Sequence, residues 1–179
     1  GYGQLHPLLA QDARVTAIER VNARHLDASV FAAAGVEVDV ADTAAAPHAP
    51  NAAVAFDLIV GDLSFISLTL VLPALAPLLA VDGQLLMLVK PQFELQPEQI
   101  GKGGIVRDEA LYAQVEQRLR AACTNAGLQV RQWLPSPIVG GDGNREFFIH
   151  AVRAGGAAVP TAASHTTASG AAVPGKHRS

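Results

Sequence analysis

The sequence predicts an α/β domain with a largely parallel sheet. Two continuous apolar runs of strand length, 56–61 and 84–90, are typical of strands that are buried on both faces. Helical patterns lie between and after these runs, and the amphipathic stretch within 103–128 is the longest of them. Strands that alternate with helices along a chain favour a parallel sheet covered by helices.

The first half of the chain alternates short strand and helix patterns. In chain order we expect a strand at 15–19, a short helix and a loose connection within 27–55, a strand at 56–61 and a helix that ends near 82–83. Pro73 and Pro77 lie inside the last helix. They should shorten or kink it, because proline lacks the backbone donor and clashes with the preceding turn.

The second half continues the alternation and ends in a different composition. In chain order we expect a strand at 84–90, a helix with Asp108 as N-cap and Gly127 as C-terminal stop, a proline-broken strand at 129–138 and a last strand before residue 153. The Ala, Gly, Ser, Thr and Pro composition of 154–179 predicts a disordered tail. We therefore divide the chain into one domain, 1–153, and this tail.

Composition narrows the class of protein. The chain has 179 residues, which suits one domain, and its net charge of −3 does not suggest a nucleic-acid binder, although local basic patches matter more than the sum. The single cysteine, Cys123, excludes an internal disulfide, fits a reducing cytoplasm and is expected to be a small buried hydrophobe. No apolar run reaches the roughly 18–20 residues of a membrane span, and no signal peptide is recognisable.

The histidines give no sign of a metal site. None of them shows the spacing of metal ligands, so no metal is predicted: His6, His25, His48, His150, His165 and His177.

Three charged residues are expected to meet at one edge of the sheet. Asp62 and Lys90 each follow a buried strand, and ligands collect at the carboxyl ends of parallel strands. The link between the last two strands contains no helix, so these strands should be antiparallel neighbours. The last strand then starts at the same edge, and Glu146 lies near that start.

The three charges suit proton transfer to or from a hydroxyl group. A lysine beside carboxylates tends to stay protonated, whereas partial burial favours the neutral amine, which can orient or deprotonate a hydroxyl. Each residue taken alone could instead mark the place where the core meets water. Their mixed signs at one predicted edge favour a functional site.

Four separated motifs resemble one enzyme family. The segments "FDLIVGDLSFISLTLVLPAL", "LVKPQFE", "GKGGIVRD" and "GNREFFIH" are similar, in this order, to those of the TlyA-type ribosomal RNA methyltransferases. These proteins are relatives of the FtsJ-like 2′-O-methyltransferases, and some were once called hemolysins. The resemblance covers roughly residues 1–153.

The resemblance implies a fold, a cofactor and a set of residues. The fold would be the Rossmann-like sheet of class I methyltransferases, with S-adenosyl-L-methionine as cofactor and ribosomal RNA or a ribosomal subunit as partner. The family's catalytic Lys-Asp-Lys-Glu set would be represented by Asp62, Lys90 and Glu146. We expect neither DNA nor a membrane as partner, and the oligomeric state is not predicted.

Other residues are assigned more loosely. Asn22 follows the expected strand at 15–19 and could contact the adenosine end of the cofactor, although a plain turn role suits it equally. Asp62 could also touch the cofactor. The loop around Lys102 and Arg107 could close over the site and meet RNA phosphates, or it could simply lead into the next helix. Phe65 could stack on a base, but core packing is the favoured expectation.

The chain departs from the family pattern at its start. It begins with Gly1, and the family's glycine-rich cofactor loop, cofactor-ribose acid, first catalytic lysine and S4-type RNA-binding domain are not found in it. We therefore expect an amino-terminal truncation without the first strands of the sheet. The 179-residue chain should be inactive and poorly stable alone, because unpaired buried backbone groups each cost about 1–3 kcal/mol.

Three alternative functions stay open at this point. A catalytically degenerate RNA- or ribosome-binding protein would share the motifs without the activity. A pore-forming hemolysin is suggested only by the old name and is opposed by the lack of a membrane-active segment. A different Rossmann-type enzyme, such as a dehydrogenase, would differ in a glycine loop that this chain does not contain.

Overall fold

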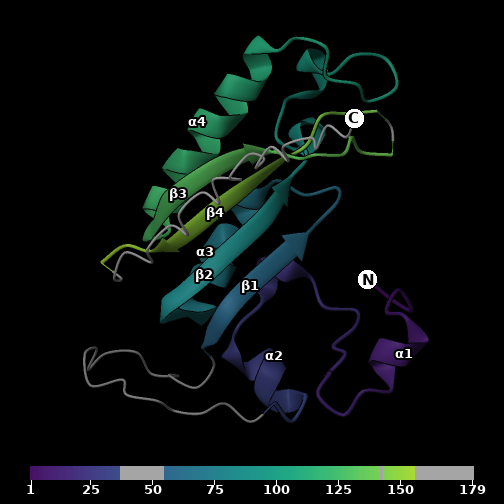
Figure 1. Ribbon diagram of the computed structural model, residues 1–179, viewed down its shortest axis with the longest axis vertical. Helices are drawn as coiled ribbons and strands as arrows, with labels where there is room; N and C mark the ends of the chain where they lie inside the picture. Colours follow the sequence, from purple (N-terminus) through teal and green to yellow (C-terminus); the bar gives the residue numbers. More distant parts are fainter. Residues whose placement is uncertain (37–54, 142, 156–179) are drawn as a thin grey trace, which may run out of the picture.

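The computed structural model describes residues 1–36, 55–141 and 143–155. Its helices and strands are, in chain order, α1 (Pro7–Ala10), α2 (Ala28–Ala33), β1 (Phe56–Asp62), α3 (Leu72–Leu75), β2 (Leu79–Val89), α4 (Ala110–Asn125), β3 (Leu128–Pro135) and β4 (Phe147–Arg153). Short 3₁₀ turns are η1 (Ala23–His25), η2 (Leu68–Leu70), η3 (Ala76–Leu78), η4 (Pro91–Phe93) and η5 (Pro97–Gln99). Figure 1 shows the strands side by side.

The described strands form one mixed sheet in the order β1-β2-β4-β3. Strands β1 and β2 are parallel, whereas the β2–β4 and β4–β3 pairs are antiparallel. The α/β class is confirmed, but the described sheet is mixed instead of largely parallel. The expected antiparallel pairing of the last two strands is confirmed, because their short link leaves no room for a crossover.

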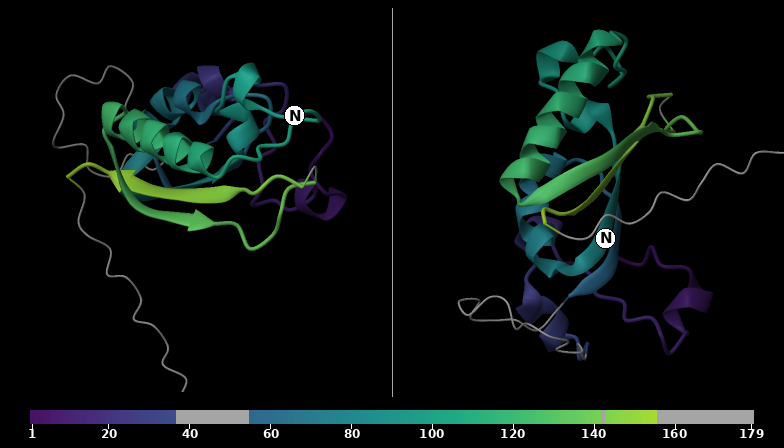
Figure 2. Two further views of the ribbon diagram at one scale, coloured as in Figure 1. Left: turned by 90° about the horizontal axis from the view of Figure 1, so that it is seen from above. Right: turned by 60° about the vertical axis from the view of Figure 1, so that its left-hand side comes forward.

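The core lies on the face of the sheet that α3 and α4 cover. Alternate residues of β2, namely Leu85, Met87 and Val89, are buried and pack with residues of β4 and of both helices. Figure 2 shows the helices gathered on this side of the strands. Cys123 of α4 is fully buried, as expected, and burial raises the pKa of its thiol to about 11. It is therefore a small apolar core residue and not a nucleophile.

Strand β1 has an apolar surface that the described residues do not cover. Leu58 and Val60 are 59% and 65% exposed, and β1 is the terminal strand of the described sheet. Leu58 and Val60 also line, with Phe56, Ile59 and Gly61 of the same strand, an apolar cavity of about 330 Å³ between β1, α2 and α3. The ring of Phe31 meets the edge of Phe56 there, with centroids 5.0 Å apart.

The prediction of a strand at 15–19 is wrong. This segment has no regular secondary structure, and the described residues supply no partner strand for its backbone. It is tied instead to the chain start, because Gly3 N–H donates to Glu19 Oε1 at 2.8 Å and Arg20 N–H donates to the Gly1 carbonyl at 3.1 Å. The short helix expected after residue 27 is confirmed as α2, and Asp27 caps it by accepting from Ser29 N–H at 2.8 Å.

The helix expected to end near 82–83 stops earlier. Its prolines divide it into η2, α3 and η3, and β2 already begins at Leu79. Gly83 lies inside β2 at an irregular point of the β1–β2 pairing. A Cβ there would lie 2.7 Å from the carbonyl oxygen of Phe56, so the strands approach too closely for a side chain.

The remaining elements agree with the sequence. Helix α4 begins at Ala110 with Glu109 as its N-cap residue, one residue later than expected, and Asp108 Oδ1 accepts from the Ala110 N–H at 2.9 Å. Gly127 follows the helix with φ +75°, the left-handed conformation that ends helices. The connection 37–54 and the tail 156–179 lie outside the described residues. No helix in the described ranges is long and apolar enough to cross a membrane.

Candidate active site

Lys90 stands between two partners at the end of β2. Its ammonium Nζ lies 2.7 Å from Asp62 Oδ1 and donates to Ser64 Oγ at 3.0 Å. The Lys90 side chain is only 15% exposed, whereas the Asp62 side chain is 66% exposed. The cation is therefore largely withdrawn from water, while the carboxylate beside it stays open to a ligand.

The ends of β1 and β2 place these groups together. Asp62 is the last residue of β1 and pairs with Leu88, and β2 ends one residue later. Pro91 then starts η4, so the chain turns away immediately after Lys90. Gly61 leaves room for the end of the Met87 side chain, with which a Cβ at this position would collide. The predicted meeting of Asp62 and Lys90 is confirmed.

Glu146 lies at the same edge without touching Lys90 in this structure. Strand β4 pairs Phe147 with Val89, so Glu146 stands at the register position opposite Lys90. It is 8% exposed, and none of its hydrogen bonds or ion pairs within the described residues reaches Lys90. Its carboxylate instead lies against Gly140, where a Cβ would be 2.6 Å from Oε1. The predicted common edge is confirmed, but only two of the three charges are in contact.

A third carboxylate, which the sequence did not single out, joins the loops after β1 and β2. Glu94 is 3% exposed and accepts from Leu68 N–H at 2.7 Å and from Ser67 Oγ–H at 2.6 Å. Burial raises the pKa of this carboxyl, although its hydrogen bonds and Arg118 oppose the shift. Nothing in "KPQFE" distinguishes it from a surface glutamate, so only the fold reveals its contacts.

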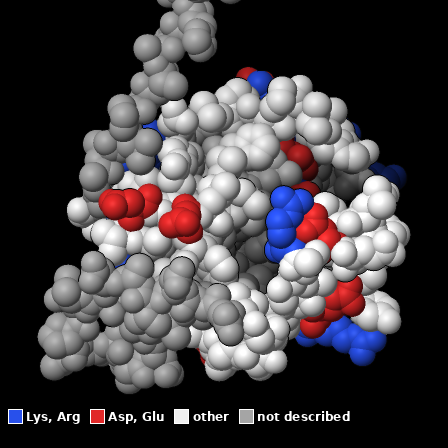
Figure 3. Space-filling model, turned by 60° about the horizontal axis from the view of Figure 1, so that its bottom comes forward, with Lys and Arg blue, Asp and Glu red and all other residues white. Residues whose placement is uncertain are grey.

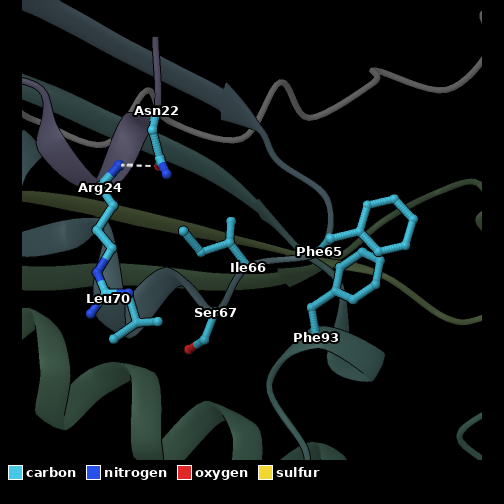
Figure 4. Close-up of a pocket in the computed structure, with 7 residues that line it drawn as sticks. All are labelled: Asn22, Arg24, Phe65, Ile66, Ser67, Leu70 and Phe93. Carbon is cyan, nitrogen blue, oxygen red and sulfur yellow. Dashed lines mark hydrogen bonds between the residues drawn. The ribbon is translucent and has the colours of Figure 1, made fainter. Parts of the chain in front are cut away.

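An open cavity of about 490 Å³ lies beside these loops. Figure 4 shows the rings of Phe65 and Phe93 together at one side and Arg24 at the other. The two ring centroids are 5.1 Å apart. Phe65 is 91% exposed and has φ +62°, so its expected packing in the core is wrong. A phenylalanine with this backbone conformation is unusual and marks a place where function commonly constrains the chain.

Asn22 also lines this cavity, so it lies near the Phe65 loop. Its Oδ1 accepts from Arg24 N–H at 3.0 Å and caps η1. The turn role is thus observed, and the amide nitrogen of Asn22 is the group that can serve a ligand. Arg24 reaches towards Leu70 in Figure 4 and is the charged member of the lining.

The loop around Lys102 and Arg107 is closed by hydrogen bonds. Gly101 N–H donates to the Ile105 carbonyl at 3.0 Å, and buried Asn144 accepts from Val106 N–H at 2.9 Å and donates to the Gly104 carbonyl at 2.9 Å. Asn144 thereby joins this loop to the segment that carries Glu146, a link that the sequence did not indicate. Lys102 and Arg107 are both exposed.

Charges of both signs are mixed on the surface. On the face shown in Figure 3, basic side chains stand in small groups beside acidic ones, and a broad basic patch is absent from the described part of that view. Among the residues that the structure describes, no group of three or more His, Cys, Asp or Glu could hold a metal ion.

Comparison with known proteins decides the family. The model of the FtsJ-like methyltransferase family matches residues 1–153. The chain belongs to the FtsJ-like methyltransferase family. This membership agrees with the methyltransferase fold expected from the motifs and decides against the dehydrogenase alternative.

Relatives in this family are similar over most of the chain. The chain is 40% identical over 150 residues to "Putative rRNA methyltransferase YqxC" of Bacillus subtilis, covering 84% of this chain and 46% of that protein. It is 38% identical over 149 residues to "16S/23S rRNA (cytidine-2'-O)-methyltransferase TlyA" of Mycobacterium tuberculosis, covering 83% of this chain and 48% of the relative. The chain thus spans about half the length of these relatives.

A solved structure supports the same family. The protein described as "Putative hemolysin from Streptococcus thermophilus" superposes with a TM-score of 0.71 at 36% identity, covering 87% of this chain and 49% of that one. The Lys90–Asp62 pair lies at the carboxyl ends of β1 and β2, and ligands commonly bind at this edge of open α/β sheets.

Proposed function

We propose that the full-length gene product that contains these residues is an S-adenosylmethionine-dependent 2′-O-ribose methyltransferase of ribosomal RNA, with Asp62, Lys90 and Glu146 in its active site. The observation that supports this most is the position of Lys90 Nζ, 2.7 Å from Asp62 Oδ1 and 3.0 Å from Ser64 Oγ at the ligand-binding edge of the sheet. The relative from M. tuberculosis is named for 2′-O-methylation of cytidine in 16S and 23S rRNA.

Each of the three charged residues has its own role in the proposed methyl transfer. When bound, S-adenosylmethionine supplies an electrophilic methyl group on a positively charged sulfur. Lys90 orients the ribose 2′-hydroxyl, and as the neutral amine, after its ammonium has released a proton to solvent, it accepts the hydroxyl proton while the oxygen becomes a nucleophile. Asp62 holds the Lys90 ammonium in place, and Glu146 faces the same edge from β4. The protein contributes mainly by aligning the reacting groups.

Two residues of this chain, Asp62 and Asn22, can form hydrogen bonds with a nucleoside-type cofactor. The open Asp62 carboxylate can accept hydrogen bonds, and the Asn22 amide nitrogen can donate one beside the same loops. We propose that these two residues contact the cofactor.

RNA would be held at the rim of the site. We propose that exposed Lys102 and Arg107 contact RNA phosphates, which position a nucleic acid without reading its sequence. Exposed Phe65, paired with Phe93, offers an aromatic face on which an unstacked base can lie.

Methyl transfer tests this function. We would measure transfer of radiolabelled methyl groups from S-adenosylmethionine to ribosomal RNA and intact subunits by the full-length gene product. Lys90→Met and Asp62→Asn should each lower kcat by about 10²–10⁴-fold, as expected when a proton-transfer group is lost. Asp57→Asn is the matched control, since Asp57 is an exposed aspartate on the same strand and should leave kcat unchanged.

Each result has a clear meaning. Transfer that depends on Lys90 and Asp62 but not on Asp57 supports the proposed function and location. If Lys90→Met transfers methyl groups as fast as the wild type, the proposed catalytic role of Lys90, Asp62 and Glu146 is wrong. Binding of ribosomal RNA without any transfer would favour the RNA- or ribosome-binding alternative. A cytoplasmic location would follow from a ribosomal substrate and stays a prediction.

A further inference from the structure

A buried carboxylate connects the two loops that carry the reactive groups. Glu94 follows η4 in the loop after β2, and its two oxygens accept from Ser67 Oγ–H at 2.6 Å and Leu68 N–H at 2.7 Å in the loop after β1. The residue is 3% exposed. Hydrogen bonds to a carboxylate away from water are strong and directional, so this contact fixes the distance between the loops.

The site depends on that distance. Lys90 and Phe93 come from the loop after β2, whereas Ser64 and Phe65 come from the loop after β1. The Lys90–Ser64 hydrogen bond of 3.0 Å and the Phe65–Phe93 ring separation of 5.1 Å both span the gap between the loops. The Lys90–Ser64 hydrogen bond and the Phe65 ring are exposed, whereas the Glu94–Leu68 hydrogen bond is buried and the Glu94–Ser67 hydrogen bond is half-buried.

Glu94 is itself firmly held. Its backbone N–H donates to the Pro91 carbonyl at 3.0 Å, and Arg118 of α4 donates to its carbonyl oxygen at 2.5 Å. The backbone of Glu94 is thus anchored to the long helix α4. Such an anchor can hold Phe65 at φ +62°, because a strained backbone persists only where its surroundings fix it from several sides.

We propose that Glu94 is a positioning residue for methyl transfer, an inference that rests on the proposed function. Its carboxylate sets the loop after β1 against the loop after β2, so that Ser64 and Phe65 stand at the correct distance from Lys90. Glu94 touches neither the substrate nor the cofactor and acts through these loops.

Two substitutions separate geometry from charge. In the full-length gene product, Glu94→Leu keeps similar bulk but removes both acceptors, and it should lower kcat by about 10–100-fold through misplacement of the reacting groups. Glu94→Gln can accept from Leu68 N–H and donate to Ser67 Oγ, so it should retain most of the activity. The affinity for S-adenosylmethionine should change little in either variant. Val115→Ala is the control, because it removes buried volume from α4 but takes away none of the hydrogen-bonding groups of Glu94, Ser67 and Leu68.

A purely structural role would predict a different pattern. Glu94→Leu and Val115→Ala would then lower the melting temperature to similar extents and leave kcat per folded molecule unchanged in both. Ser67→Ala removes one of the two Glu94 contacts and serves if Glu94→Leu does not fold. It should lower kcat by less than Glu94→Leu does.

A chemical readout tests the positioning without methyl transfer. With a limiting amine-acylating reagent, mass spectrometry gives the labelling of Lys90 relative to that of exposed Lys102 in the same molecule. Glu94→Leu or Ser67→Ala should raise this ratio because Lys90 loses its fixed partners, whereas Val115→Ala should not. An unchanged ratio in both loop variants would overturn the proposal. Failure of the wild-type protein to methylate ribosomal RNA would overturn the proposed function instead, and the labelling ratio would still decide the role of Glu94.

Discussion

Phe65 is the clearest case of a residue whose position the hydrophobic pattern of the sequence does not predict. It lies in the apolar run "LSFISL", which favours burial, yet it is 91% exposed. Its backbone has φ +62°, a conformation that costs about 1–3 kcal/mol for such a residue. An exposed aromatic side chain that is held in a strained conformation beside Lys90 and Phe93 is better suited to meet a ligand than to stabilise the fold.

We predict that Phe65→Leu weakens RNA binding without destabilising the protein. Loss of a stacking face should cost about 1–3 kcal/mol of RNA affinity. The free energy of unfolding should change by no more than about 0.5 kcal/mol, as is usual for exposed positions. Binding isotherms with a ribosomal RNA fragment and urea unfolding would measure the two quantities. Phe65→Trp, which keeps an aromatic face, should restore binding, and equal affinities of the Leu variant and the wild type would contradict the stacking role.

At the scale of secondary structure, the ends of β1 and β2 and the start of β4 determine which residues meet at the site. Strands β1 and β2 are parallel and end at the same edge, which brings Asp62 to Lys90. The short link between β3 and β4 returns the chain to that edge and places Glu146 opposite Lys90. The same link passes so close to Glu146 that Gly140 has no room for a side chain, since a Cβ would lie 2.6 Å from Oε1.

We predict that Gly140→Ala lowers methyl transfer by displacing the Glu146 carboxylate. The loss should reach about 10-fold or more in kcat, because small misplacements at a reacting centre are costly. Gly141→Ala is a matched control, since a Cβ at Gly141 meets no atom within 4 Å. Steady-state kinetics of the two variants of the full-length product would compare them. Equal kcat values would argue against any role of the Glu146 position.

At the scale of the whole molecule, the described sheet is covered by helices on one face and ends in an apolar strand. Leu58 and Val60 of β1 are more than half exposed, and an apolar cavity of about 330 Å³ opens beside them. The backbone groups on the outer side of β1 have no strand partner among the described residues. Such an edge is poorly stable and prone to pair with other chains.

We predict that the 179-residue chain, produced alone, is inactive and melts without a sharp transition. The outer edge of β1 faces water, so its backbone groups can be hydrated, but Leu58 and Val60 leave their apolar side chains exposed and contribute little stability through burial. Circular dichroism during heating would test the melt, with the full-length gene product as comparison. A sharp cooperative transition of the isolated chain would contradict this prediction.

Much of the fold was predictable because its signals are local. The runs at 56–61 and 84–90, the cap at Asp108 and the stop at Gly127 act through neighbouring residues, and each is found near its expected place. Two expectations failed where a distant partner decides. The segment 15–19 has strand-like side chains but no strand beside it in the described residues. The helix before β2 ended early, because the pairing of β2 with β1 begins at Leu79.

The sequence by itself determined the α/β class, the family motifs and the meeting of Asp62 with Lys90. The sequence shows which charged residues directly follow a strand-like run, and parallel strands bring such residues to the same edge of the sheet. Only the tertiary structure decided that Ser64 completes the contacts of Lys90, that Glu146 lies apart from it and that Phe65 faces solvent. These facts depend on the packing of loops that are distant in sequence, and buried Glu94 and Asn144 hold those loops through hydrogen bonds that no local pattern predicts.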